Sequence, residues 1–163
     1  MAGDWVVNQY GGPEGFLGWL ALQPRFHRKS LSELKEAEAK SLGPNLQALD
    51  EVLKHYWTHQ FPDDPIERVY VVYMFESPFS EPQPKPEDNF HLHIHVIPRT
   101  KKLGELGRLR VTRNGVTWND GWLMPRLMEH GMVPEPYLLT LDNRVPRATS
   151  LMDYVRHELA IRP

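Results

Sequence analysis

Three of the eight histidines, His91, His93 and His95, alternate with apolar residues in the segment FHLHIHVIP at positions 90–98. On an extended strand, residues two apart point to the same side at intervals of roughly 6 to 7 Å. The segment therefore predicts a strand with three imidazoles on one face and apolar side chains on the other. Imidazole titrates near neutral pH, so such a row suits chemistry better than it suits a core or a plain surface.

Two kinds of chemistry use a row of imidazoles. In the first, a neutral imidazole attacks a phosphorus atom while its neighbours orient it and bind phosphate oxygens. In the second, two or three imidazoles bind a divalent metal, as His-x-His strand pairs do in zinc enzymes. A polar strand face without chemical function is the third interpretation. The histidine pattern taken alone leaves these interpretations open.

Composition narrows the function classes. The chain has 163 residues, enough for one domain with a sizeable core. Nineteen Lys and Arg against 21 Asp and Glu give a formal net charge of −2, which disfavours a nucleic-acid or anionic-membrane binder. The absence of cysteine excludes disulfides, thiolate zinc sites and cysteine nucleophiles. The start of the chain does not resemble a signal peptide, and no apolar run has transmembrane length, so we expect a soluble, cytoplasmic protein without membrane partners.

The histidine row needs a sheet to hold it, and the sequence predicts four strands. Their β-branched, aromatic and apolar residues are typical of strands, and loops separate them. These strands are expected at 5–7, 15–23, 68–75 and 90–98. Strands in this order around helices predict an α+β fold, an antiparallel sheet with helices on one face.

The helices are predicted from capping and periodicity. Ser30 and Glu33 have the spacing of a capping box, so a helix is expected to begin at 30–35. A stripe at three- and four-residue steps follows, and Gly43-Pro44 inside it predicts a kink or a break between two helical pieces. The stripe consists of Leu42, Leu46, Leu49, Leu53 and Tyr56.

The last third of the chain carries fewer signals. Asn114-Gly115 predicts a tight hairpin between strands at 109–112 and 116–118. A short helix is expected at 122–130. Ser150, with Asp153 three residues later, is expected to cap a final helix. One face of that helix would carry Leu151, Val155 and Leu159.

The histidine segment resembles a known family. His-Leu-His-Ile-His-Val-Ile at 91–97, continuing into Pro98-Arg99, is similar to the signature of the histidine triad (HIT) superfamily of nucleotide hydrolases and transferases, especially its dinucleoside-polyphosphate hydrolase branch. Upstream, LALQPRFH at 20–27 is similar to the family's hydrophobic strand ending in Pro-Lys/Arg-x-His. The resemblance extends from about Trp5 to Thr100 and gives no account of the residues beyond Lys101.

The resemblance implies a role for each histidine. His93 would be the nucleophile that takes up a nucleoside monophosphate as a phosphoramidate, and His95 would bind phosphate beside it. His91 would orient the nucleophile through its other ring nitrogen. Residues 16–22 and the loop before them would supply the nucleoside pocket. This chemistry needs no metal or other cofactor.

The chain departs from the family pattern at three positions. Trp19 stands where members usually carry another histidine, and Glu87 and Asp88 stand where they often carry Gln and Ser or Thr. Two carboxylates beside a phosphate would repel it unless they point away, meet a cation or protonate the leaving group. Trp19, Asp88 and Asn89 are nevertheless retained as candidate substrate-binding residues.

Two basic residues complete the candidate site. Arg99, just past the histidine strand, is the best single cation for a leaving phosphate. His27 would support the triad or the pocket, although a surface position is the plainer interpretation.

These expectations combine into one hypothesis with two rivals. Residues 1–100 would form a HIT-like nucleotide-binding domain, and 101–163 an extension packed on that domain or on a dimer partner. The hypothesis is an enzyme that cleaves a phosphoanhydride or phosphoramidate bond of a nucleotide, acting as a homodimer without a nucleic-acid partner. The rivals are a metal-binding hydrolase that uses the histidine row as ligands, and a nucleotide-binding module without turnover.

Overall fold

The computed structural model describes residues 4–10, 15–73, 91–105, 110–113, 116–119, 138–140 and 142–160. Side chains at 15, 105, 110–113, 116–119, 138, 144 and 160 are outside that description. The predicted helix at 122–130 and the candidate residues Glu87, Asp88 and Asn89 lie outside the described residues.

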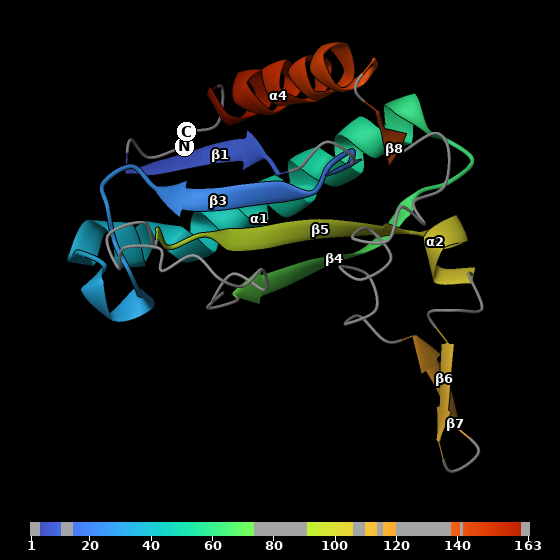
Figure 1. The fold of residues 1–163 in the computed structure, drawn as a ribbon, viewed down its shortest axis with the longest axis horizontal. Coiled ribbons are helices and arrows are strands. Elements are labelled where there is room, and N and C mark those ends of the chain that lie inside the picture. The colour runs from blue at the N-terminus through green and yellow to red at the C-terminus, as the bar shows by residue number, and fades with distance from the viewer. Residues whose placement is uncertain are drawn as a thin grey trace, which may run out of the picture.

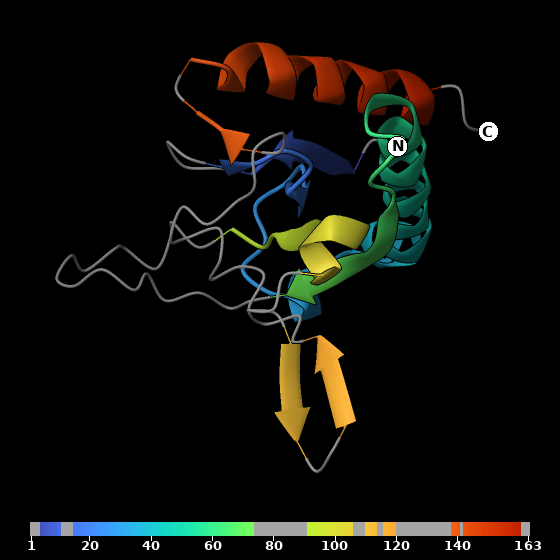
Figure 2. The same cartoon turned by 90° about the vertical axis from the view of Figure 1, so that its right-hand side faces the viewer.

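An antiparallel sheet of four strands forms the centre of the fold, in the order β1-β3-β5-β4 (Figure 1). The strands are β1 (Trp5–Gln9), β3 (Leu20–Pro24), β5 (Ile94–Thr100) and β4 (Ile66–Tyr73). The long helix α1 (Glu36–Gln60) covers one face of the sheet, as Figure 2 shows. This arrangement confirms the predicted α+β fold with an antiparallel sheet.

The apolar run at 15–23 forms two short strands, which corrects the prediction of a single one. β2 (Gly15–Phe16) ends in a turn, and β3 begins at Leu20. Gly18 in this turn has φ +88°, a conformation that residues with a Cβ rarely adopt. A Cβ built on Gly18 would lie 2.8 Å from the Trp57 ring of α1, so the turn presses directly on the helix. Hydrophobicity alone could not reveal this break, because both strands and the turn are buried.

The start of α1 differs from its prediction. Ser30 precedes a single 3-10 turn, η1 (Leu31–Glu33), and α1 begins at Glu36. The Glu33 carboxylate accepts a hydrogen bond from the backbone N–H of Lys29, not from that of Ser30. Glu38 instead accepts from the backbone N–H of Lys35 at 2.7 Å, which satisfies a free donor at the true start of the helix.

The helix continues through Gly43-Pro44, so the predicted break into two pieces is wrong. Pro44 lies inside a helix of 25 residues. Its apolar stripe runs past the proline on both sides: Leu42 and Leu46 pack partly buried against the core, and Leu49 and Leu53 are fully buried. Packing of this continuous stripe compensates for the backbone hydrogen bond that a proline removes.

The histidine strand is shorter than predicted. β5 begins at Ile94, so His91 and His93 lie in the extended approach to the strand rather than within it. This approach is fastened by a hydrogen bond from the backbone N–H of Leu92 to the carbonyl of Arg28 at 2.6 Å. Leu92 and Ile94 are buried and His91 and His93 are half-buried, as predicted for the two faces, but His95, predicted on the same face as the other two histidines, is fully buried.

The C-terminal third returns to the core. β8 (Leu138–Leu139) pairs antiparallel with β2, and α4 (Arg144–Ala160) packs along α1 and β1. Helix α4 starts well before Ser150, so Ser150 does not cap it. Leu151, Val155 and Leu159 are buried in the common core, as the helical spacing predicts.

The remaining elements lie beyond the carboxyl end of β5. The short helix α2 (Lys101–Glu105) follows that strand directly. The predicted hairpin is confirmed: β6 (Arg110–Arg113) and β7 (Val116–Asn119) pair antiparallel, with Arg113 opposite Val116. The hairpin extends away from the sheet (Figures 1 and 2).

Candidate active site

The ring of His93 is held by one of its two nitrogens. Its Nδ1 lies 3.0 Å from the backbone carbonyl oxygen of His91. A carbonyl only accepts hydrogen bonds, so Nδ1 carries the proton. In the neutral ring the other nitrogen, Nε2, then holds a lone pair. Nε2 is buried and has no hydrogen-bond partner within the described part of the chain. His93 therefore has the arrangement of an imidazole prepared to attack.

The ring of His95 is held in the opposite sense. The indole Nε1–H of Trp19 donates to His95 Nδ1 at 2.9 Å. Because an indole nitrogen only donates, Nδ1 must be the acceptor, and the neutral ring carries its proton on Nε2. This Nε2 is also buried without a hydrogen-bond partner in the described residues. Burial of the ring, followed by the nearby charge of His93, lowers the pKa of His95 to about 4. At neutral pH His95 is an uncharged donor.

The two rings lie close together. Their centroids are 4.8 Å apart, and the ring planes are nearly perpendicular at 86°. One ring thus presents a lone pair and its neighbour presents an N–H. A tetrahedral phosphate needs both a nucleophile at phosphorus and donors at its oxygens, and this pair can provide one of each.

The His91 ring nitrogen Nε2 contacts the backbone at the end of β3 and not the His93 ring, so the orienting role that the resemblance implied for His91 would pass through its backbone. Its Nε2 bonds to the backbone carbonyl of Pro24 at 2.9 Å, and the contact with His93 comes from its own backbone carbonyl. The ring therefore ties the approach to β5 onto the end of β3. The reason is geometric: His91 precedes the strand, so the regular alternation that would align three rings does not apply to it.

Two residues of the site were missed by the sequence analysis. The Tyr10 ring lies parallel to His93, with centroids 6.3 Å apart, and meets His95 edge-on at 4.7 Å. Gln9 fixes the turn beneath it: its amide donates to the carbonyls of Tyr10, Phe16 and Trp19 and accepts from the backbone N–H of Gly18. Neither residue belongs to a recognisable pattern. Only the adjacency of β1 and β3 brings them to the histidines.

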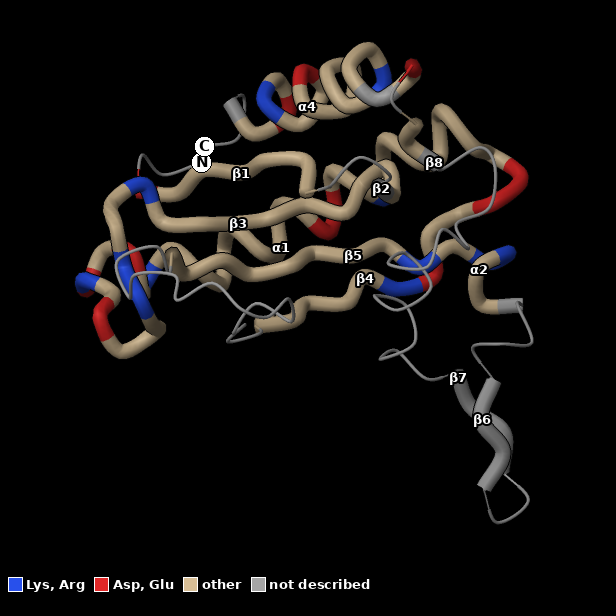
Figure 3. Tube along the Cα trace, in the orientation of Figure 1, with Lys and Arg blue, Asp and Glu red and all other residues tan. Residues whose placement is uncertain are grey.

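The basic candidates lie elsewhere. Arg99 is buried and donates to the Glu67 carboxylate at 2.8 Å. It is four residues beyond His95 on the same strand, about 13 Å away at the usual rise. Figure 3 shows positively and negatively charged residues together where β5 meets α2. The structure therefore brings Arg99 to an ion pair and not to the triad. His27 is exposed, and its ring touches that of His91 edge-on at 5.4 Å.

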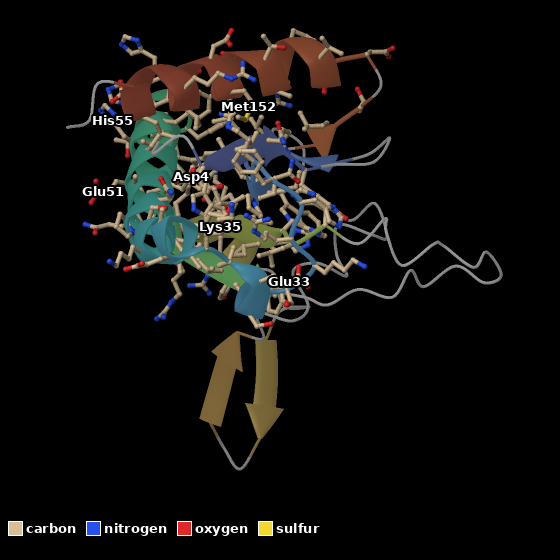
Figure 4. The ribbon with its side chains drawn as sticks, turned by 90° about the vertical axis from the view of Figure 1, so that its left-hand side faces the viewer. Asp4, Glu33, Lys35, Glu51, His55 and Met152 are labelled. Atoms are coloured by element: carbon tan, nitrogen blue, oxygen red, sulfur yellow. The ribbon has the colours of Figure 1, made fainter. Side chains whose placement is uncertain are left out.

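A second histidine pair lies on the outside of α1. The rings of His55 and His59 are 4.4 Å apart, and His55 Nδ1 contacts the Tyr154 hydroxyl of α4. Figure 4 shows His55 on the outer side of α1 near α4. Among the described residues, no group of three or more His, Asp or Glu side chains could hold a metal ion. His91, His93 and His95, which belong to the described residues, form no such group either.

Comparison with known proteins gives no further assignment. No protein-family model matches the chain, and no curated protein is significantly similar to it in sequence. Membership of the histidine triad superfamily therefore stays a prediction. In the described part of the chain, no helix combines the length and apolar character needed to cross a membrane.

Proposed function

We propose that the protein cleaves a phosphoanhydride or phosphoramidate bond in a nucleotide through a nucleotidyl-His93 intermediate. His93 Nε2 donates its lone pair to the α-phosphorus and forms a P–N bond. The bond from phosphorus to the leaving group breaks, and the leaving group departs with the bonding electron pair and takes up a proton from solvent. Water then attacks the same phosphorus and gives up a proton to solvent, while the P–N bond breaks with its electron pair returning to Nε2, which releases the nucleoside monophosphate.

The observation that carries this proposal is the complementary state of two neighbouring nitrogens. His93 Nε2 holds a lone pair because the proton of the neutral ring is on Nδ1, which donates to the carbonyl of His91. His95 Nε2 holds a proton because Trp19 donates to its Nδ1. A metal ion bound between these rings would need a lone pair on both Nε2 atoms, so this difference favours phosphate over a cation.

The charges also favour phosphoryl chemistry. Attack leaves a positive charge on the His93 ring, and the carbonyl dipole of His91 stabilises that charge at Nδ1. The low pKa of His95 keeps the neighbouring ring neutral, so no second cation opposes the intermediate. His95 would then bind a phosphate oxygen by a hydrogen bond without carrying charge.

The proposal includes the setting of the reaction. The substrate would be a nucleoside polyphosphate or nucleoside phosphoramidate, no metal would be required, and the enzyme would act as a homodimer in the cytoplasm. It would have neither a nucleic-acid partner nor a membrane partner. A net charge of −2 fits a small-molecule nucleotide substrate better than it fits a nucleic acid.

The test is intact-mass measurement after brief exposure to a panel of adenine and guanine polyphosphates. We expect a mass increase equal to one nucleotidyl group in the wild type and none in His93→Ala. His59→Ala is the matched control, because His59 is an exposed histidine of α1 whose ring contacts the backbone carbonyl and the ring of His55. This variant should keep the adduct and the turnover.

Three results would oppose the proposal. His93→Ala with full turnover on every substrate would exclude this nucleophile. Stoichiometric bound zinc, together with loss of activity on chelation, would favour the metal-binding hydrolase. Thermal stabilisation by a nucleotide, with neither adduct nor product after long incubation, would favour a binding module.

A further inference from the structure

We propose that Trp19 is a positioning residue that fixes the orientation and tautomer of His95, so that the Nε2–H of this histidine faces the substrate phosphate. The inference deepens the proposed function and rests on it. Trp19 itself would not touch the reacting atoms. Its indole would determine which nitrogen of the neighbouring imidazole donates a hydrogen bond and which accepts one.

The indole is held rigidly enough to do this. Trp19 is 7% exposed, and its Nε1–H reaches His95 Nδ1 at 2.9 Å. Its backbone N–H donates to the carbonyl of Phe16 at 3.0 Å, and its carbonyl accepts from Tyr10 at 2.7 Å. The Tyr10 ring packs against the indole with centroids 4.8 Å apart. Backbone and ring contacts therefore leave the indole a single direction in which to donate.

An indole constrains an imidazole in a way that another histidine would not. Its nitrogen donates only and has no titration in the ordinary pH range. A histidine at position 19 could donate or accept, and its own charge would change near neutral pH. With Trp19 in this place, the Nδ1 lone pair of the neutral His95 ring accepts the hydrogen bond from the indole. The proton is therefore on Nε2 at every pH where the ring is uncharged.

A proton on His95 Nε2 determines how this ring interacts with the phosphate. An Nε2–H can donate to a non-bridging oxygen, whereas an Nε2 lone pair would repel it. Loss of the indole N–H would let the His95 ring turn over or change tautomer, and part of the population would then present a lone pair. The expected loss is roughly 10- to 100-fold in kcat, the usual effect of removing a partner that orients a functional histidine.

Two matched variants isolate the indole proton. Trp19→Phe removes Nε1–H and keeps most of the ring volume. Trp5→Phe makes the same change in another buried tryptophan of the sheet, whose Nε1 donates to the Glu38 carbonyl and the Ser41 hydroxyl. Within the described residues, the Trp5 indole makes no hydrogen bond to a histidine. A general effect of losing a buried indole hydrogen bond would appear in both variants. A positioning effect would appear in Trp19→Phe alone.

The primary measurement is ¹⁵N NMR of the histidine rings in the free protein, which reports the tautomer without any substrate. In the wild type we expect His95 to be present as a single Nε2–H tautomer. In Trp19→Phe we expect a second tautomer or a turned ring, and in Trp5→Phe we expect the same spectrum as in the wild type. Trp19→His should regain part of the lost kcat and add a titration step to its pH profile. A nitrogen–nitrogen coupling across the Trp19–His95 hydrogen bond tests the contact in the wild type, even if Trp19→Phe fails to fold.

The Trp19 inference and the proposed function can fail independently. A wild-type His95 protonated on Nδ1 overturns the inference, as does a Trp19→Phe variant with an unchanged His95 spectrum and unchanged kcat. If the spectra change as expected but the wild type forms no nucleotidyl adduct, the proposed function fails and the control of His95 by Trp19 stands. If both results are as expected, both proposals are supported.

Discussion

The His91 carbonyl and the His93 ring form a contact between neighbours on the same chain: the Nδ1 of His93 lies 3.0 Å from that backbone oxygen. A backbone acceptor cannot be removed by changing a side chain. The orientation of the His93 ring therefore depends on the path of the chain at 91–93 more than on the identity of residue 91.

We first predict that His91→Ala keeps much of the activity. The variant loses the ring contact with the Pro24 carbonyl at 2.9 Å but retains the backbone acceptor for His93. We expect a loss of about 1 kcal/mol in the free energy of unfolding and a fall in kcat of less than about tenfold. Chemical denaturation and steady-state turnover measure these quantities. A loss of activity as complete as that of His93→Ala would show that the ring itself takes part.

The second prediction concerns stability in mild acid. The pKa of His95 is about 4 in the folded protein because the ring is buried, against an ordinary value of 6.5. Between these values the unfolded chain binds a proton that the folded chain does not, so acidification favours unfolding. We expect stability to fall progressively from pH 6.5 towards pH 4, by up to roughly 3 kcal/mol.

This acid effect can be assigned by substitution. In His95→Gln the slope of unfolding free energy against pH between 6.5 and 5 should decrease, whereas His59→Gln should leave it unchanged. The Arg28 guanidinium bonded to Glu38 lowers the pKa of that carboxyl below 4.5, so its contribution is lost only at lower pH. An equal slope in wild type and His95→Gln would contradict the prediction.

The third prediction contrasts two glycines. Gly18→Ala should destabilise the protein by about 2–4 kcal/mol, because φ is +88° and the new Cβ would meet the buried Trp57 ring at 2.8 Å. Gly43→Ala should stabilise it by roughly 0.5–1 kcal/mol, because this glycine lies inside α1 with nothing within 4 Å of the new methyl group. Thermal and chemical unfolding give both values, and a similar effect at the two positions would contradict the assignment of the turn.

The fourth prediction is that Arg99 acts in stability and not in the reaction. Arg99→Met should lower the melting temperature, because it removes the guanidinium that contacts Glu67 and leaves the Glu67 carboxylate without this partner. Turnover of the folded variant should remain within about threefold of the wild type. A drop in kcat of several orders of magnitude, with the fold intact, would restore Arg99 as a leaving-group cation.

Periodicity predicted the larger features of this fold. The alternation around His93 separated the half-buried His91 and His93 from the buried Leu92 and Ile94 but not the fully buried His95, and the spacing of Leu151, Val155 and Leu159 identified the buried side of α4. Each signal recurs at several positions of one segment, so the side chains that carry it lie on one side and are predicted together. The Asn114-Gly115 hairpin was predictable for a related reason, since a short turn fixes its own register.

The features that sequence reasoning missed depend on contacts between distant segments. Tyr10 and Gln9 reach the site only because β1 pairs with β3. Trp19 is recognisable as an unusual residue, but its hydrogen bond to His95 arises from the packing of β3 beside β5. Of the kink or break predicted at Gly43-Pro44, the break is wrong because the long apolar stripe of α1 overrides a local propensity that opposes helix there.

The pairing of β2 with β8 has a consequence for biosynthesis. Phe16 and Leu138 come from opposite parts of the chain, yet their strands pair beside the turn that carries Trp19. A nascent chain therefore emerges with the histidines already translated and this turn still lacking its neighbour. Pairing of β8 with β2 must wait until β8 has left the ribosome, so the surroundings of the candidate site are completed late in synthesis.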